Sequence, residues 1–169
     1  KYQLLCRTES DIYQHLPTLK QYAEGKEVVE LGVRAIVSTW ALLAGKPKSL
    51  LSVDIQYPAD FGGDLIETEL AAAEADIFFI FKKEDSLTIN LPEHDVLFID
   101  TNHTYNQLSQ ELKRHSPKTR EYILMHDTNQ EEFPDMRRAI NDFLDSNKEW
   151  EIKEQFENCH GLSVLQRIC

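Results

Sequence analysis

The feature that most constrains this chain is a series of short apolar runs, each rich in branched side chains and almost continuously hydrophobic. The runs cover residues 28–33, 50–55, 77–81, 96–100 and 122–126. A strand with one face in water alternates apolar and polar residues, whereas a strand covered on both faces does not. The runs therefore predict five buried strands of a parallel sheet.

Helical spacing appears in segments that lie before, between and after these runs. We expect helices over residues 11–22 (with Ser10 as the N-terminal cap), 38–44, 65–75, 105–114 and 136–144. Residues 150–158 and 162–168 instead resemble two strands of a terminal antiparallel hairpin. Strands and helices in this order predict an α/β fold with helices on both faces of the sheet.

Length and charge narrow the function classes. A chain of 169 residues predicts a single domain over 1–169, and it starts at Lys1 without a Met, which leaves room for an upstream segment. The formal net charge is -11 and no basic stripe is present, which argues against nucleic acid and anionic membranes as partners. No apolar run approaches the roughly 20 residues of a membrane span. Three cysteines without C-x-x-C spacing predict reduced thiols in a cytoplasmic protein.

Carboxylates stand where the predicted strands end. They are Glu30, Asp54, the pair Glu84 and Asp85, Asp100 and Asp127, the last preceded by His126. Ligands of open α/β sheets bind outside the carboxyl ends of the strands. We therefore expect these carboxylates to meet donors on a ligand, or a cation.

The first two strand ends point to a nucleoside. Gly32 allows close backbone approach, and Asp54 is placed to accept both hydroxyls of a ribose. The chain lacks G-x-G-x-x-G and G-x-x-x-x-G-K-[ST], so an ordinary dehydrogenase, kinase or GTPase is disfavoured. An exposed loop aspartate is the plain alternative for Asp54 by itself.

Taken in order, these stretches resemble class I S-adenosylmethionine-dependent methyltransferases. Within them the chain is most similar to the small branch of sugar and macrolide O-methyltransferases and cephalosporin-hydroxylase-like proteins, from about Tyr13 to Arg167. The stretches that carry the resemblance are 29–34 (VELGVR), 38–43 (STWALL), 52–55 (SVDI), 84–87 (EDSL), 96–100 (VLFID), 103–105 (HTY), 124–128 (LMHDT) and 160–165 (HGLSVL).

The resemblance implies a Rossmann-like sheet of strand order 3-2-1-4-5-7-6 and a set of donor-binding residues. Glu30, the turn at Gly32 and Ser38 are expected to hold the amino-acid end of S-adenosylmethionine, and Asp54 its ribose. Asp85 and the backbone of Ser86 are expected beside the adenine. Related enzymes are often oligomeric, so a homo-oligomer is a further expectation.

The same resemblance implies that Asp100 faces the transfer centre. In related enzymes the aspartate that matches Asp100 binds Mg²⁺, and the histidine that matches His103 is the catalytic base. A base or a metal is needed to deprotonate an alcohol acceptor. Asp100 and Asp127 offer oxygen ligands for a divalent cation, with His126 as a third ligand that suits Mn²⁺ or Fe²⁺ better than Mg²⁺. The plainer alternatives are a polar loop residue for His103 and a hydrogen-bonded structural pair for His126 and Asp127.

The function expected from the sequence is therefore O-methylation of a small hydroxylated metabolite such as a sugar. One departure motivates an alternative: Ile36 stands where the related loop has its second glycine, and a β-branched residue resists positive φ. The alternative is a degenerate, non-catalytic S-adenosylmethionine-binding domain in a larger assembly. A non-haem iron oxygenase is a third reading, with His103, His126 and one aspartate as the triad.

Overall fold

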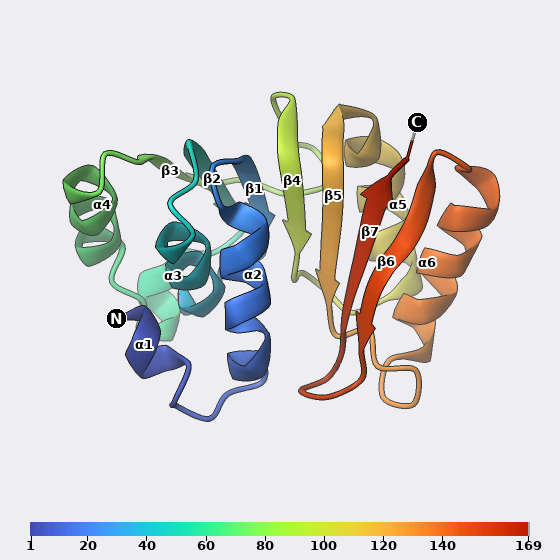
Figure 1. Cartoon of the computed structure of the whole chain (residues 1–169), viewed down its shortest axis with the longest axis horizontal. Coiled ribbons are helices and arrows are strands. Elements are labelled where there is room, and N and C mark those ends of the chain that lie inside the picture. Colours follow the sequence, from blue (N-terminus) through green and yellow to red (C-terminus); the bar gives the residue numbers. More distant parts are fainter. Residues whose placement is uncertain (169) are drawn as a thin grey trace.

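One seven-stranded sheet forms the centre of the computed structural model, which describes residues 1–168 (Figure 1). Its strand order is β3-β2-β1-β4-β5-β7-β6, and only β7 runs in the direction opposite to the other six strands. The strands are β1 (Glu27–Leu31), β2 (Ser49–Asp54), β3 (Phe78–Lys83), β4 (His94–Ile99), β5 (Thr119–His126), β6 (Trp150–Phe156) and β7 (Leu162–Arg167). The predicted fold class, the parallel strands and the terminal hairpin are confirmed.

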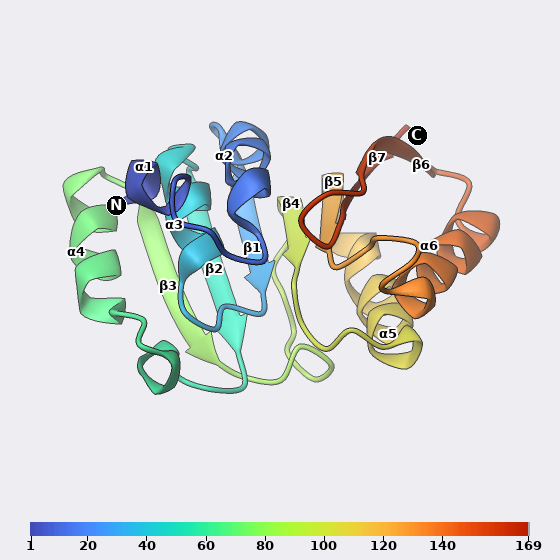
Figure 2. The ribbon, with the colours of Figure 1, turned by 90° about the horizontal axis from the view of Figure 1, so that it is seen from below.

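Helices cover both faces of this sheet, as Figure 2 shows edge-on. On one face lie α1 (Tyr2–Leu5), α2 (Leu16–Ala23), α3 (Val37–Ala44) and α4 (Leu65–Glu74). On the other lie α5 (Tyr105–His115) and α6 (Pro134–Ser146). The connection from β3 to β4 contains no helix, so the alternation expected from the sequence is interrupted once.

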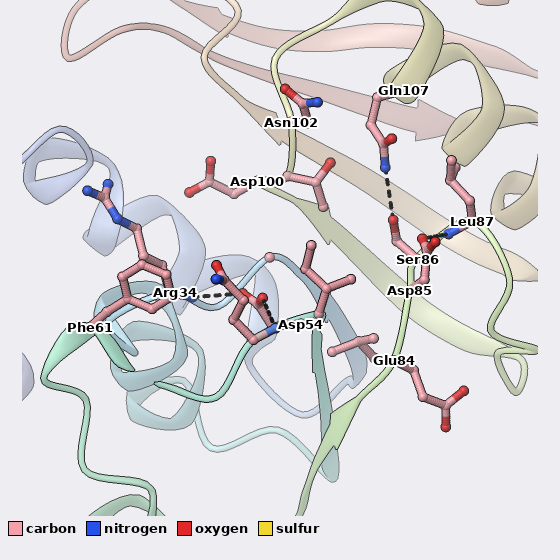
Figure 3. A pocket seen from close by; sticks show the side chains of 15 residues that line it. Arg34, Asp54, Phe61, Glu84, Asp85, Ser86, Leu87, Asp100, Asn102 and Gln107 are labelled. Carbon is pink, nitrogen blue, oxygen red and sulfur yellow. Dashed lines mark hydrogen bonds between the residues drawn. The ribbon is translucent and has the colours of Figure 1, made fainter. Parts of the chain in front are cut away.

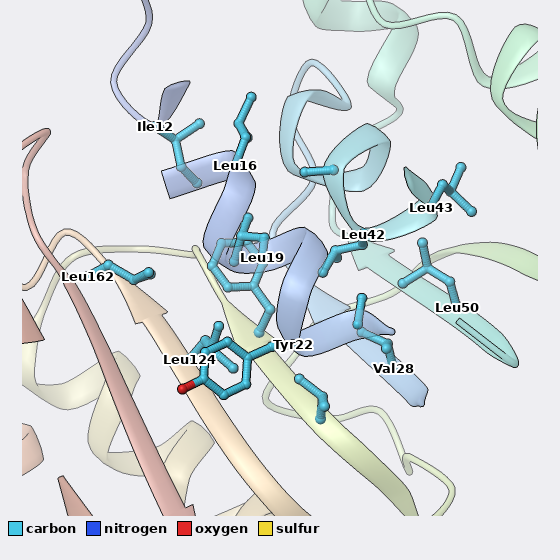
Figure 4. Packing of buried hydrophobic residues seen from close by; sticks show 14 of the residues in the cluster. Ile12, Leu16, Leu19, Tyr22, Val28, Leu42, Leu43, Leu50, Leu124 and Leu162 are labelled. Carbon is cyan, nitrogen blue, oxygen red and sulfur yellow. The ribbon is translucent and has the colours of Figure 1, made fainter. Parts of the chain in front are cut away.

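Two hydrophobic cores, one per face, hold the layers together. In the first, Leu16 and Leu19 of α2 pack with Leu42 of α3 over Val28 of β1 (Figure 4). In the second, Leu108 and Leu112 of α5 pack with Ile140 of α6 over Leu97 and Ile123 of the central strands. The near-continuous apolar runs are therefore explained: successive side chains of β1, β4 and β5 enter opposite cores.

The first predicted helix is wrong at its start. Residues 11–22 contain a 3₁₀ turn over Tyr13–His15, and the α-helix begins only at Leu16. Pro17 lies in the first turn of α2, where its missing N–H costs no hydrogen bond. Ser10 does not cap the helix, and its buried hydroxyl has no hydrogen-bond partner among residues 1–168. No helix within residues 1–168 is long and apolar enough to cross a membrane.

Candidate active site at the carboxyl edge of the sheet

The carboxyl ends of β1 to β5 meet along one edge, and two joined cavities open there. The first, about 410 Å³, is lined by Asp54, Asp85, Ser86, Asn102 and Gln107 among others (Figure 3). The second, about 560 Å³, is lined by Asp11, Ser38, His103 and Asp127 among others. The residues common to both are Gly32, Arg34, Phe61, Asp100 and Thr101. Of the strand-end residues singled out in the sequence, Asp54, Glu84, Asp85, Asp100 and Asp127 line these cavities, whereas Glu30 and His126 line neither.

Gly32 joins the two halves of this edge. Its φ is +88°, and a Cβ on it would lie 1.9 Å from the backbone oxygen of Asp100. Its N–H donates to the carbonyl of Val53. The glycine is therefore required first by the protein's own backbone, which brings the ends of β1, β2 and β4 together.

Asp54 organises the loop that follows β1. Its Oδ2 accepts the N–H groups of Val33 (2.8 Å) and Arg34 (3.0 Å), and its Oδ1 accepts that of Gln56 (2.9 Å). Arg34 itself has φ 47°. Asp54 therefore holds the loop and lines the first cavity at the same time.

Ile36 does not break this loop, contrary to the difficulty expected for a β-branched side chain. The residue adopts φ 67° and ψ 17° immediately before α3, and its N–H donates to the carbonyl of Val33. The side chain is buried, 1% exposed. Burial holds Ile36 in a backbone conformation that isolated isoleucine avoids. The loop keeps its turn without the second glycine.

Glu30 lies beneath the loop with no exposed surface. Ser38 donates to its Oε1 at 2.5 Å, while Thr39 and Ser52 donate to its Oε2 at 2.7 Å and 2.6 Å. Burial raises the pKa of Glu30 to about 7, against the effect of the three hydroxyls. The structure thus places both Glu30 and Ser38 in a network that fastens β1, β2 and α3, with Ser38 also lining the second cavity.

A second buried carboxylate, Glu111 on α5, supports the far end of the first cavity. It accepts hydrogen bonds from Ser86 (2.6 Å), Thr101 (2.8 Å) and Gln107 (2.8 Å), and burial raises its pKa. Asp85 is exposed, and among the described residues its carboxylate accepts only the N–H of Leu87. The network fixes the loop that carries Asp85 and Ser86 against the end of β4.

Glu111 was not predicted from the sequence, although a signal was present. Leu108, Glu111, Leu112 and His115 are the buried residues of α5 and stand at helical spacing. A carboxylate in the buried stripe of an amphipathic helix indicates a buried polar network. Arg34, Phe61, Thr101, Asn102 and Gln107, which line the first cavity, were also missed because a cavity wall leaves no pattern in sequence.

Four titratable side chains gather at the ends of β4 and β5. Nε2 of His103 lies 2.7 Å from Oδ2 of Asp127 and 3.7 Å from Oδ1 of Asp100. These two carboxylates raise the pKa of His103 to about 9. The histidines in turn hold the pKa values of Asp100 and Asp127 below the usual range, although burial opposes this. Asp127 has φ 53°, a conformation that aspartate tolerates better than most residues.

His126 borders the same carboxylates from the buried side. Its Nε2 donates to the carbonyl of Cys159 at 3.0 Å. Its Nδ1 lies 3.2 Å from Oδ2 of Asp127 and 3.5 Å from Oδ1 of Asp100, out of line for a hydrogen bond. Burial lowers the pKa of His126, but the two carboxylates outweigh burial and raise it.

Ligand atoms suited to a cation converge here. Atoms of Asp100, His103 and Asp127 all lie within 4.8 Å of one another. His126, expected as the nitrogen ligand, is not in this set, although its Nδ1 adjoins both carboxylates. A carboxylate pair with one imidazole is a donor set that a divalent cation can use.

Comparison with known proteins shows which fold this is. No protein-family model and no curated protein sequence matches the chain. Solved structures do: an O-methyltransferase from Bacillus cereus in complex with SAH has 15% identity and a TM-score of 0.66, with 91% of this chain and 80% of that chain covered.

Two other similar solved structures are methyltransferases whose names differ from that of the O-methyltransferase. A ribosomal protein L11 methylase from Lactobacillus delbrueckii subsp. bulgaricus has 13% identity and a TM-score of 0.69, with 95% and 80% coverage. The N-methyltransferase NodS from Bradyrhizobium japonicum WM9 has 14% identity and a TM-score of 0.64, with 91% and 93% coverage. The chain thus has the fold of class I S-adenosylmethionine-dependent methyltransferases, a fold that does not determine the acceptor.

Proposed function

We propose that the protein is an S-adenosylmethionine-dependent methyltransferase acting on an oxygen of a small hydroxylated metabolite such as a sugar. The observation that carries this proposal is the pair of joined cavities at the carboxyl edge, one beside Asp54 and Asp85 and the other beside His103 and Asp127. Gly32 and Asp100 line both cavities, and between these two residues a donor in the first cavity would meet an acceptor in the second.

The first cavity fits the donor's nucleoside. Asp54 accepts three hydrogen bonds, and a carboxylate can accept about four, so one acceptor position is left, for one ribose hydroxyl rather than the two expected from the sequence. Asp85 and Gln107 line the other end, where an adenine would lie. When bound, S-adenosylmethionine supplies a methyl group on a positively charged sulfur.

In the second cavity the proposed work of His103 is to accept the acceptor's proton, which the neutral ring does as the pH rises toward and above its pKa of about 9. Its bond to Asp127 fixes the ring, as an orienting carboxylate does for a general base. The side chain is 37% exposed, so an acceptor can reach it. The net charge of -11 disfavours RNA as the acceptor.

A divalent cation on Asp100, His103 and Asp127 is the alternative to a base at His103, because a ring nitrogen that binds a cation cannot also accept a proton. The imidazole in this set makes Mn²⁺ a better probe than Mg²⁺. We expect calorimetric titration with Mn²⁺ to show binding that weakens at least about tenfold in Asp127→Asn, because the carboxylate supplies both charge and a ligand atom. Equal binding by the wild type and Asp127→Asn would contradict a cation at this site. Asp135→Asn on α6 is the control and should bind Mn²⁺ like the wild type.

The donor part of the proposal is tested by calorimetric titration with S-adenosylhomocysteine, the demethylated product. We expect micromolar binding by the wild type and a loss of at least about tenfold in Asp85→Ala, whose side chain makes only a local contact. Asp145→Ala, far from the cavities on α6, should bind like the wild type. Failure of the wild type to bind at millimolar ligand would contradict the proposed function.

A further inference from the structure

Ile36 occupies a backbone conformation that favours glycine, and the side chain must therefore have a use. Its φ of 67° and ψ of 17° lie in the left-handed region, which β-branched residues avoid. Glycine would adopt the same turn without strain. A residue held in such a conformation near a ligand site indicates that its side chain positions something there.

The side chain of Ile36 packs directly under the turn between β2 and α4. A Cβ placed on Gly63 would lie 2.8 Å from Cγ1 and 3.0 Å from Cδ1 of Ile36, and 3.0 Å from Cβ of Pro58. The contact leaves no room for one additional carbon. The φ of Gly63 is not in the left-handed region, so this glycine is required by packing against Ile36 and Pro58.

The turn that rests on Ile36 is closed by its own hydrogen bonds. The N–H groups of Asp60, Gly62 and Gly63 donate to the carbonyls of Tyr57, Ala59 and Pro58. It is therefore a compact unit, and its Gly63 lies against Ile36 of the loop after β1.

This turn carries Phe61 to the place where the two cavities join. Phe61 lines both cavities and is 40% exposed. Figure 3 shows its ring beside Arg34, on the side of the cavity away from Ser86 and Gln107. The position of Phe61 thus depends on where the turn sits, and the turn sits on Ile36.

We propose that Ile36 is a positioning residue for the donor: its side chain seats residues 58–63 and so holds Phe61 as a preformed wall of the donor cavity. This proposal rests on the proposed function. It extends that function to a residue that lines neither cavity. A wall seated only part of the time lowers affinity in proportion to its seated fraction.

The first arm of the test measures S-adenosylhomocysteine affinity by calorimetry in Ile36→Gly. If the turn is then seated about a tenth of the time, affinity falls about tenfold. Ile36→Val, which keeps the β-branch, restores most of the affinity. Asp76→Gly relieves the same kind of strain (φ 56°) away from both cavities and leaves affinity unchanged. Unchanged affinity in Ile36→Gly would overturn the proposal.

A double-mutant cycle shows whether Ile36 acts through Phe61. Phe61→Ala weakens binding, and adding Ile36→Gly to it weakens binding by no more than about a further twofold, because the wall is already absent. A double variant whose loss equals the product of the two single losses would contradict action through Phe61.

Amide hydrogen exchange in the ligand-free protein separates this proposal from the proposed function. The amides of Asp60, Gly62 and Gly63 exchange faster in Ile36→Gly than in the wild type, because the turn loses its support. Unchanged exchange overturns the seating role whatever the ligand does. If the wild type binds no S-adenosylhomocysteine but exchange is faster, the proposed function fails and the seating of the turn stands.

Discussion

Buried charged groups at the carboxyl edge of the sheet have two different kinds of surroundings. Glu30 lies beneath the loop after β1 and Glu111 lies at the far end of the first cavity. Each is surrounded by neutral donors: three hydroxyls on Glu30, and two hydroxyls and an amide on Glu111. Beside the second cavity, Asp100, His103, His126 and Asp127 crowd together, and Nδ1 of His126 has no hydrogen bond.

The difference separates architecture from chemistry. A buried carboxylate that accepts several hydrogen bonds makes the surrounding structure rigid. Glu30 and Glu111 in this way hold the loops that a nucleoside would contact. A cluster of four groups whose pKa values depend on one another is costly to bury, and such clusters concentrate where protons or cations are handled. We therefore assign support to the first pair and reaction to the second cluster.

The largest expected effect comes from Gly32, where the two halves touch. Gly32→Ala should destabilise the protein by more than about 4 kcal/mol or prevent folding, since the new Cβ would lie 1.9 Å from the backbone oxygen of Asp100. Urea denaturation measures this.

Gly62 provides the matched control, because it has a similar φ of +79° but nothing within 4 Å of the added carbon. Gly62→Ala should cost only about 1 kcal/mol, the strain of the backbone alone. Similar losses for both variants would show that backbone strain, and not the contact with Asp100, makes Gly32 necessary.

His103→Ala tests the reactive half. Turnover should fall about 10²- to 10⁴-fold if the ring is the general base, while S-adenosylhomocysteine affinity stays within about twofold, because His103 lines only the second cavity. Steady-state kinetics with an acceptor found by screening sugars, combined with calorimetry, measures both quantities. Unchanged turnover would remove His103 from the mechanism, and loss of donor binding would show that the halves are not separable.

Glu30→Gln tests the role of the buried Glu30 through the pH dependence of the free energy of unfolding. Because burial raises the pKa of Glu30 from 4.5 to about 7, the folded state binds its proton more tightly than the unfolded state. The stability due to this proton is complete below about pH 4.5 and is lost as pH rises through about 7, a change of about 2 kcal/mol between pH 5 and 8.

The measurement is urea denaturation of wild type and Glu30→Gln at pH 5 and pH 8. Glutamine does not ionise, so the variant should lack this component, and its stability relative to the wild type should rise with pH. The comparison is needed because His94, whose pKa burial lowers to about 4, gives an opposite slope in both proteins. Parallel pH profiles would show that Glu30 stays ionised in the fold.

Much of the fold was predictable because it depends on local pattern. The runs at 28–33 and 96–100 lie between two cores, so their apolar character is visible without any tertiary knowledge. The helix over 11–22 was mispredicted because apolar spacing continues through Ile12, while the backbone turns into a helix only at Leu16. Spacing reports which face is buried, not where the helix begins.

The site was predictable where it depends on strand ends, and not where it depends on contacts between elements. Parallel strands end at one edge, so the carboxylates at 54, 85, 100 and 127 were expected to be neighbours, and they line the two cavities. Glu30 was expected at the ligand but lies wholly buried among hydroxyls, because α3 folds back over the end of β1. Which of two strand-end carboxylates is covered depends on a contact between elements.

By itself, the sequence determined the order of strands and helices, the hairpin and the edge where polar residues gather, because these follow from hydrophobic period and chain direction. Only the tertiary structure decided that Ile36 adopts a left-handed turn, that Gly32 is required by the backbone of Asp100, and that Glu111 supports the loop of Ser86. The physical reason is that each of these depends on the distance between atoms remote in sequence. Local propensity opposes such a conformation as that of Ile36, and packing overrides it.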